Sequence, residues 1–210
     1  GASLLEIQGG NGFVNGQVRR PIATTNGILT YRQSGGNVFI YGNNANLTKA
    51  KLEVLNEGSE FTMSGGTINI VRGGGTTFGD LYVRPAASAV TGGTIIFSQT
   101  PAFGPGIDLA QAYSMDANSA LNNLTVTGKT TATTRNASLS LMVSPLVLNG
   151  TLSISNSFST FSSNNNSLTI KGDLNNSGTY NYGINRTVFS GGAQAVTGSS
   201  VTDFYDLEVS

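Results

Sequence analysis

Short runs of alternating apolar and polar residues recur along the whole chain, separated by Gly, Asn and Ser. Most runs are three to five residues long, which is the length and the period of a half-buried β-strand. A helical period of apolar residues is nearly absent. The pattern therefore predicts an all-β protein whose short strands are joined by tight turns. Typical runs are residues 38–41, 52–54, 68–70, 81–83, 124–126, 152–154 and 168–170.

Two stretches of the chain match each other without a gap at an offset of 126 residues. Residues 64–70 and 190–196 both begin with Ser-Gly-Gly, and residues 78–83 and 204–209 both read Phe-x-Asp-Leu-x-Val. The offset equals six steps of 21, and apolar positions recur about 20 to 23 residues apart, with one double step. Recurrence at this period is typical of stacked repeats. The recurring positions are Val38, Phe61, Leu81, Leu124, Leu148, Leu168, Val188 and Leu207.

These observations predict a β-solenoid, or parallel β-helix, of about 20–22 residues per coil and about ten coils. Antiparallel sandwich domains in tandem are the alternative, but they do not predict the long gapless match. In a solenoid, Leu, Ile, Val and Phe point inward, while Thr, Ser and Asn point outward and form ladders. The Gly-Gly pairs at 65–66, 92–93 and 191–192 are expected to mark one corner, because tight corners need positive φ.

We interpret residues 1–210 as a single solenoid segment, and as a slice of a longer repeat array because neither end has a polar helical cap. Residues 98–120 break the pattern with Pro101 and Pro105, and we predict an insertion there, with weak helical character over 107–115. Insertions in solenoids map to one face and often carry binding, although a loop without a ligand is the simpler interpretation.

The composition limits the classes of function. Lys plus Arg and Asp plus Glu number 11 each, the net charge is zero, and 38% of the residues are hydrophobic. A balanced, sparse charge argues against a nucleic-acid partner, and the apolar content argues against disorder. No apolar run is long enough for a membrane span. The chain has no cysteine, which leaves out disulfides, thiolate chemistry and sulfur-ligated metals.

The chain also has no histidine, so carboxylate pairs are the remaining candidates for catalysis. The pairs are Glu57 with Glu60 and Asp203 with Asp206, and both are explained more simply as turn or corner residues. Calcium-loop and phosphate-loop motifs are absent. We therefore predict that the protein is not an enzyme and that it uses no metal and no cofactor.

Exposed aromatic rings are the remaining candidates for ligand contact, because they stack on sugars. Tyr113, Tyr180 and Tyr182 are the residues that we select, and Tyr180 and Tyr182 share one face if their segment is extended. Packing in the core or at its rim is the alternative interpretation of these tyrosines.

The last third of the chain resembles a known class of repeats. It contains Leu-Val-Leu-Asn-Gly-Thr-Leu at 146–152, Asn-Ser-Gly-Thr at 176–179, Gln-Ala-Val-Thr-Gly at 194–198 and Phe-Tyr-Asp-Leu at 204–207. This order is similar to the repeats of very large cell-surface proteins of Bacteroidota. Asp206 stands where those repeats usually have Asn, and Ala195-Val196 replaces the commoner Thr-Ile. The resemblance covers 121–210 well and 34–97 weakly, and it is absent over 1–20 and 98–120.

The resemblance implies export by the type IX secretion system and display at the cell surface, in association with the outer membrane. Giant adhesins for gliding motility are the best-known members. We therefore expect a structural and adhesive module, a rigid rod, with surface glycans or an abiotic surface, flanking repeats of the same chain and the secretion machinery as partners. The alternatives are a glycan-binding or glycan-cleaving β-helix and a segment of a fibre or tail spike.

Overall fold

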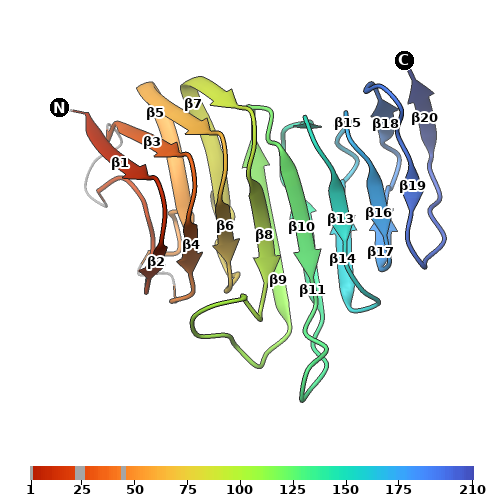
Figure 1. Cartoon of the computed structure of the whole chain (residues 1–210), viewed down its shortest axis with the longest axis horizontal. Coiled ribbons are helices and arrows are strands. Elements are labelled where there is room, and N and C mark those ends of the chain that lie inside the picture. The colour runs from red at the N-terminus through yellow and green to blue at the C-terminus, as the bar shows by residue number, and fades with distance from the viewer. Residues whose placement is uncertain (1, 22–26, 44–45) are drawn as a thin grey trace.

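The computed structural model describes residues 2–21, 27–43 and 46–210, and these residues form a parallel β-solenoid. The coils stack along one axis, and the N-terminus and C-terminus lie at opposite ends of the molecule (Figure 1). Every pairing between named strands is parallel and joins equivalent positions of successive coils, as in Asn11 with Asn37 and Asn37 with Thr67. The predicted fold class is therefore confirmed.

The strands form three sheets, which we call the first, second and third sheet. The first contains β1 (Ser3–Ile7), β3 (Leu29–Gln33), β5 (Leu52–Met63), β7 (Leu81–Val90), β9 (Gln111–Ala117), β11 (Ala137–Leu141), β14 (Ser159–Ser162) and β17 (Thr179–Asn181). The second contains β2 (Asn11–Val14), β4 (Asn37–Ile40), β6 (Thr67–Ile70), β8 (Thr94–Ser98), β10 (Asn123–Thr127), β13 (Leu152–Ile154), β16 (Leu174–Asn176) and β19 (Val196–Thr197). The third contains β12 (Leu146–Leu148), β15 (Leu168–Ile170), β18 (Arg186–Phe189) and β20 (Asp206–Val209).

The coils are longer and fewer than the sequence period predicts. Along the second sheet, the paired positions Asn11, Asn37, Thr67, Thr94 and Asn123 are 26 to 30 residues apart. Only the last steps, from Leu152 to Leu174 and on to Val196, have the predicted length of 22 residues. The described part of the chain therefore makes about seven turns rather than ten.

The gapless match between residues 64–83 and 190–209 does not mark one structural unit throughout. Both Ser-Gly-Gly corners follow a strand in the same way, because the N–H of Ser64 bonds the Gln33 carbonyl and the N–H of Ser190 bonds the Ile170 carbonyl one coil back. The second halves diverge, since Leu81 lies in the first sheet and Leu207 in the third. The recurring apolar positions of the sequence thus belong to three different sheets.

The core is a continuous stack of inward-facing apolar side chains. In β4 and β6 the residues Val38, Ile40, Ile68 and Ile70 join this core, while their neighbours point outward. Parallel pairing places like on like, so that the rings of Tyr31 and Phe61 stack with their centroids 5.4 Å apart. Burial of such residues supplies the main stabilisation of the fold, because each removes its apolar surface from water.

The glycine corners at 65–66 and 92–93 stack as predicted. Gly66 has a φ of 76° and Gly93 a φ of 84°, which is the left-handed region that glycine tolerates best. A Cβ on Gly66 would also collide with the Gly36 carbonyl of the preceding coil. The pair at 191–192 follows an equivalent strand, but neither glycine has a positive φ, so that corner differs in conformation.

The insertion is shorter than predicted and its second half is not helical. Strand β8 ends at Ser98 and β9 begins at Gln111, so the irregular segment is 99–110 and the predicted helical stretch 107–115 enters a strand. A second loop, residues 128–136, follows β10. Both loops project from the same edge of the solenoid, at the bottom of Figure 1.

Replacing Leu168 with Asp tests the inward register. Leu168 is completely buried in β15, whereas the adjacent Thr169 points outward and is only half-buried. Leu168→Asp should lower the free energy of unfolding in urea by several kcal/mol, because an unpaired carboxylate would enter the core. Thr169→Asp is the matched control and should cost about 1 kcal/mol or less. Equal effects of the two substitutions would contradict the register.

Gly66→Ala and Gly10→Ala separate backbone strain from steric contact. Both glycines have positive φ, 76° and 72°, but a Cβ on Gly10 meets nothing within 4 Å. We expect Gly10→Ala to cost about 1 kcal/mol of unfolding free energy and Gly66→Ala about 2 to 4 kcal/mol, since the latter also pushes two coils apart. Urea titration measures both, and equal costs would show that the coils can separate freely at this corner.

Candidate functional site

Two of the three tyrosines predicted as surface contacts lie in the core. Tyr113 is 2% exposed and its hydroxyl donates to the Val71 carbonyl at 2.9 Å. Tyr180 is 6% exposed, and its hydroxyl is hydrogen-bonded to Thr187 at 2.7 Å. Burial raises the pKa of both phenols. The prediction that Tyr113 and Tyr180 contact a ligand at the surface is therefore wrong.

Tyr182 shares a face with Tyr180, as the alternation predicts, and their ring centroids are 6.3 Å apart. The ring of Tyr182 is partly buried and packs against the core from its rim. The pattern identified the shared face but not its direction, because Asn181 between the two tyrosines is the residue that faces solvent. Ligand contact by Tyr182 stays a prediction.

The predicted carboxylate pairs occupy exposed or ion-paired positions. Glu60 accepts a charge-assisted hydrogen bond from Arg32 at 3.1 Å, which holds the pKa of Glu60 below its usual value. Glu57, Asp203 and Asp206 are exposed. Among the described residues, no three His, Cys, Asp or Glu side chains are grouped so that they could hold a metal ion.

The outer face of the second sheet differs from the rest of the surface in its lack of charge. None of its eight strands contains Asp, Glu, Lys or Arg, whereas the first and third sheets carry Arg32, Glu60, Arg186 and Glu208 among others. The outward positions alternate with the core positions of these strands. They are Asn11, Phe13, Asn37, Phe39, Thr67, Asn69, Thr94, Ile96, Asn123, Thr125, Ser153, Asn175 and Thr197. We call this surface the neutral face.

A hydrogen-bonded ladder runs along the neutral face from coil to coil. The Asn37 amide donates to Asn11 Oδ1 at 2.8 Å, and the Thr67 hydroxyl donates to Asn37 Oδ1 at 2.8 Å. The Asn69 amide then donates to the Thr67 hydroxyl at 2.9 Å. The predicted outward ladder of Asn, Ser and Thr is therefore present, and it fixes the orientation of these side chains.

An aromatic cluster lies beside this ladder at the N-terminal end of the neutral face. Phe13 and Phe39 stack with centroids 5.2 Å apart, and Phe103 of the insertion meets Phe39 edge to face at 6.3 Å. Phe39 is only 1% exposed although it points away from the core, while Phe13 and Phe103 are 49% and 54% exposed. Gly104 lies against the ring of Phe13. The insertion thus covers Phe39 and leaves two rings open to solvent.

Polar contacts fix the insertion that carries Phe103. Asp108 forms ion pairs with Lys129 at 2.9 Å and Arg135 at 3.3 Å, and it also accepts a hydrogen bond from Thr133. All three partners belong to the neighbouring 128–136 loop. These hydrogen bonds and ion pairs lower the pKa of Asp108. At the base of the insertion, the buried Gln99 donates to the Asn136 carbonyl at 2.6 Å, so both loops are held together.

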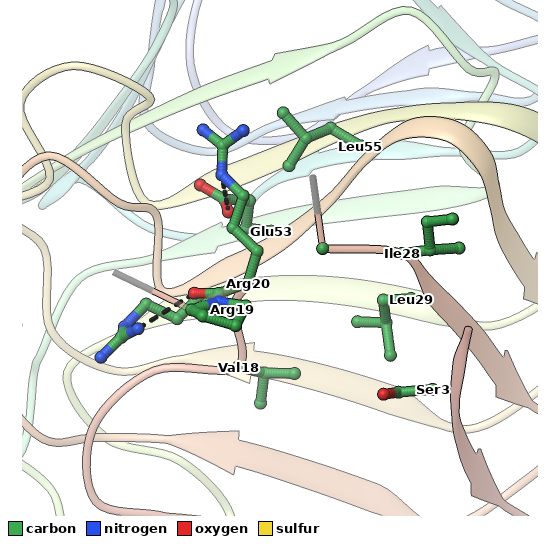
Figure 2. Close-up of a pocket in the computed structure, with 10 residues that line it drawn as sticks. Ser3, Val18, Arg19, Arg20, Ile28, Leu29, Glu53 and Leu55 are labelled. Atoms are coloured by element: carbon green, nitrogen blue, oxygen red, sulfur yellow. Dashed lines mark hydrogen bonds and ion pairs between the residues drawn. The ribbon is translucent and has the colours of Figure 1, made fainter. Parts of the chain in front are cut away.

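A pocket of about 210 Å³ lies on the opposite, charged part of the N-terminal coils. Figure 2 shows its apolar lining, which includes Val18, Leu29 and Leu55, and the ion pair of Arg20 with Glu53 at 2.9 Å. The Arg20 guanidinium also lies 5.2 Å from the centroid of the Phe78 ring. This ion pair ties the segment around residue 20 to strand β5, which is a structural role in closing the first coils.

Asp80 is the least expected polar group, because it is completely buried. Its two carboxylate oxygens accept hydrogen bonds from the backbone N–H groups of Gly75 at 2.9 Å and Ser114 at 3.0 Å. Burial raises the pKa of Asp80 to about 6, although these bonds and the charge of Lys51 act in the opposite direction. Asp80 therefore fastens the glycine-rich loop before β7 to the next coil.

Lys51 is the buried cation of this region. It donates to the carbonyl of Gly42, and burial lowers the pKa of Lys51 to about 8. The charge of Asp80 opposes this shift and that of Arg72 adds to it. No sequence motif marks these groups, since Asp80 and Asp206 occupy the same motif position, yet Asp206 is exposed.

Comparison with protein-family models, with curated proteins and with solved structures found no match to this chain. Within the described residues, no helix has the length and apolar character needed to cross a membrane. The site is therefore judged on its own geometry.

Asp80→Asn should change the pH dependence of stability. Because the folded pKa of Asp80 is raised from 3.8 to about 6, the folded state holds this proton more tightly than the unfolded chain. The unfolding free energy of the wild type should therefore fall, relative to Asp80→Asn, as the pH rises from 3.8 to about 6. The total relative fall should be about 2 kcal/mol.

Urea titrations at half-unit pH intervals measure this difference. Asp206→Asn is the matched control, because it removes an exposed carboxylate from the same motif position and should leave the pH profile unchanged. Parallel curves for the wild type and Asp80→Asn would contradict a raised pKa at Asp80.

Proposed function

We propose that this protein is a structural and adhesive module of a secreted cell-surface protein, in which the solenoid acts as a rigid rod. The observation that carries the proposal is the stacking of about seven turns along one axis, with the first and last strands at opposite ends (Figure 1). With strands about 4.8 Å apart, these turns extend over roughly 35 Å. Such a rod holds its two ends at a fixed separation.

Stiffness follows from the pairing. Each inner coil is hydrogen-bonded to both neighbours, and large side chains stack in register inside it, as Phe161 does on Tyr180 with centroids 6.1 Å apart. Bending the rod would stretch these hydrogen bonds on one side. Adhesion by such a rod works through many weak contacts, because each bound site raises the effective concentration of the next.

Export by the type IX secretion system and display in association with the outer membrane belong to the same proposal. They are supported by the resemblance of residues 121–210 to Bacteroidota surface repeats, and the lack of charge on the second sheet fits a partner other than nucleic acid. The proposed partners are surface glycans or an abiotic surface, flanking repeats of the same chain, and the secretion machinery.

Bead adhesion under flow tests this function. Micrometre beads that carry the protein, coupled through its N-terminal amine, should stay on glass or on mucin-coated glass at shear rates that remove beads coated with serum albumin. Beads carrying the core variant Leu168→Asp provide a second control, because the loss of the fold should abolish retention. Release of wild-type beads at the same shear as albumin beads on both surfaces would contradict the adhesive function.

A further inference from the structure

We propose that the open rings of Phe13 and Phe103, together with the adjacent Asn11 and Asn37, form a binding site for a neutral polysaccharide. The inference rests on the proposed adhesive function and specifies its ligand class. It replaces the buried tyrosines with two aromatic residues that are about half exposed.

The chemistry of the two parts of this surface matches the two parts of a sugar ring. A pyranose presents an apolar C–H face and a rim of hydroxyl groups, so it binds best where an aromatic face adjoins hydrogen-bonding groups. Here the Phe13 ring and Asn11 are two residues apart on the same face of β2, and Asn37 follows on β4 at 2.8 Å from Asn11. Amide groups both donate and accept, as sugar hydroxyls do.

The absence of charge selects the kind of polysaccharide. The strands of the neutral face contain no Lys or Arg to pair with uronate or sulfate groups, and no Asp or Glu to attract a cationic sugar. The nearest charged cluster, around Asp108, is neutralised by its own partners Lys129 and Arg135. A neutral, hydroxyl-rich chain therefore loses no charge hydration when it binds here.

The site is ordered before binding. The ladder orients the Asn11 and Asn37 amides, the Asp108 ion pairs fix the insertion, and Phe39 supports both rings from beneath. Side chains that are already fixed lose little entropy when the ligand arrives. The flat ladder also continues past Thr67 towards the later coils, which gives an extended chain several sugar-length positions.

Titration calorimetry with soluble polysaccharides tests the site on the intact protein. The probes are hydroxyethylcellulose, xyloglucan and galactomannan, with polygalacturonate as the anionic comparison. We expect the wild type to bind at least one neutral polymer, and Phe13→Ala to bind it roughly fivefold to tenfold more weakly. Phe13→Tyr should restore binding, because it keeps the ring.

Tyr205→Ala is the matched control, since Tyr205 is 65% exposed but lies outside the neutral face, and its affinity should equal that of the wild type. Circular dichroism and thermal melting of each variant show whether the fold is kept. Phe103→Ala provides a second test from the insertion, and it should weaken binding in the same range as Phe13→Ala.

Several outcomes overturn the inference. These are no binding to any neutral polymer, equal binding by Phe13→Ala and the wild type, and preference for polygalacturonate. Dimerisation in solution that Phe13→Ala abolishes would show instead that the patch joins two copies. The bead assay separates the two proposals, because Phe13→Ala beads that adhere like wild-type beads remove this site and keep the adhesive function.

Discussion

Parallel pairing in register between successive coils is the constraint on which the rest of this structure depends. Each strand donates and accepts backbone hydrogen bonds on both sides, so a side chain must lie directly over its equivalent in the neighbouring coil. A shift of one residue would turn a row such as Val38 over Ile68 from the core to the solvent. What lies between the strands is free to vary, and coils of 22 to 30 residues therefore share one register.

Buried polar side chains complete the corners where that pairing is interrupted. Gln33 receives the Tyr31 hydroxyl at 2.7 Å and donates to the carbonyls of Gly36 and Thr67. Asn176, at the other end, donates to the Val201 carbonyl at 3.1 Å. These side chains satisfy carbonyl groups that have no strand partner, and an unsatisfied group of this kind in the interior would be costly. The solenoid therefore owes its corners to internal amides as well as to glycines.

The alternation of apolar and polar residues was sufficient to predict the strands, the solenoid and the outward ladder, because these depend on local period. The assignment of strands to sheets was not predictable in the same way. Leu81 and Leu207 occupy the same motif, yet a long loop with Asp80 at its end precedes Leu81, while Phe204 packs against Tyr180 before Leu207 begins the next side. A gapless match in sequence conceals this difference in loop path.

The candidate site could not be predicted for a related reason. Phe13 and Phe39 lie in matching positions of two runs, but their third partner, Phe103, comes from an insertion more than sixty residues later. Only the path of the insertion brings the three rings together. The tyrosines were selected because Tyr hydroxyls are polar, whereas the fold satisfies those hydroxyls internally, with Val71 for Tyr113 and Thr187 for Tyr180.

The uncharged second sheet has a consequence for the medium in which the protein works. Attraction between charged surfaces weakens as dissolved ions accumulate, and it fades within about 10 Å at moderate ionic strength. A contact made through rings and amides, without a formal charge on either partner, has no such term to lose. Attachment through this face would hold equally well in fresh water and in brine, and the cell would not need to adjust it when salinity changes.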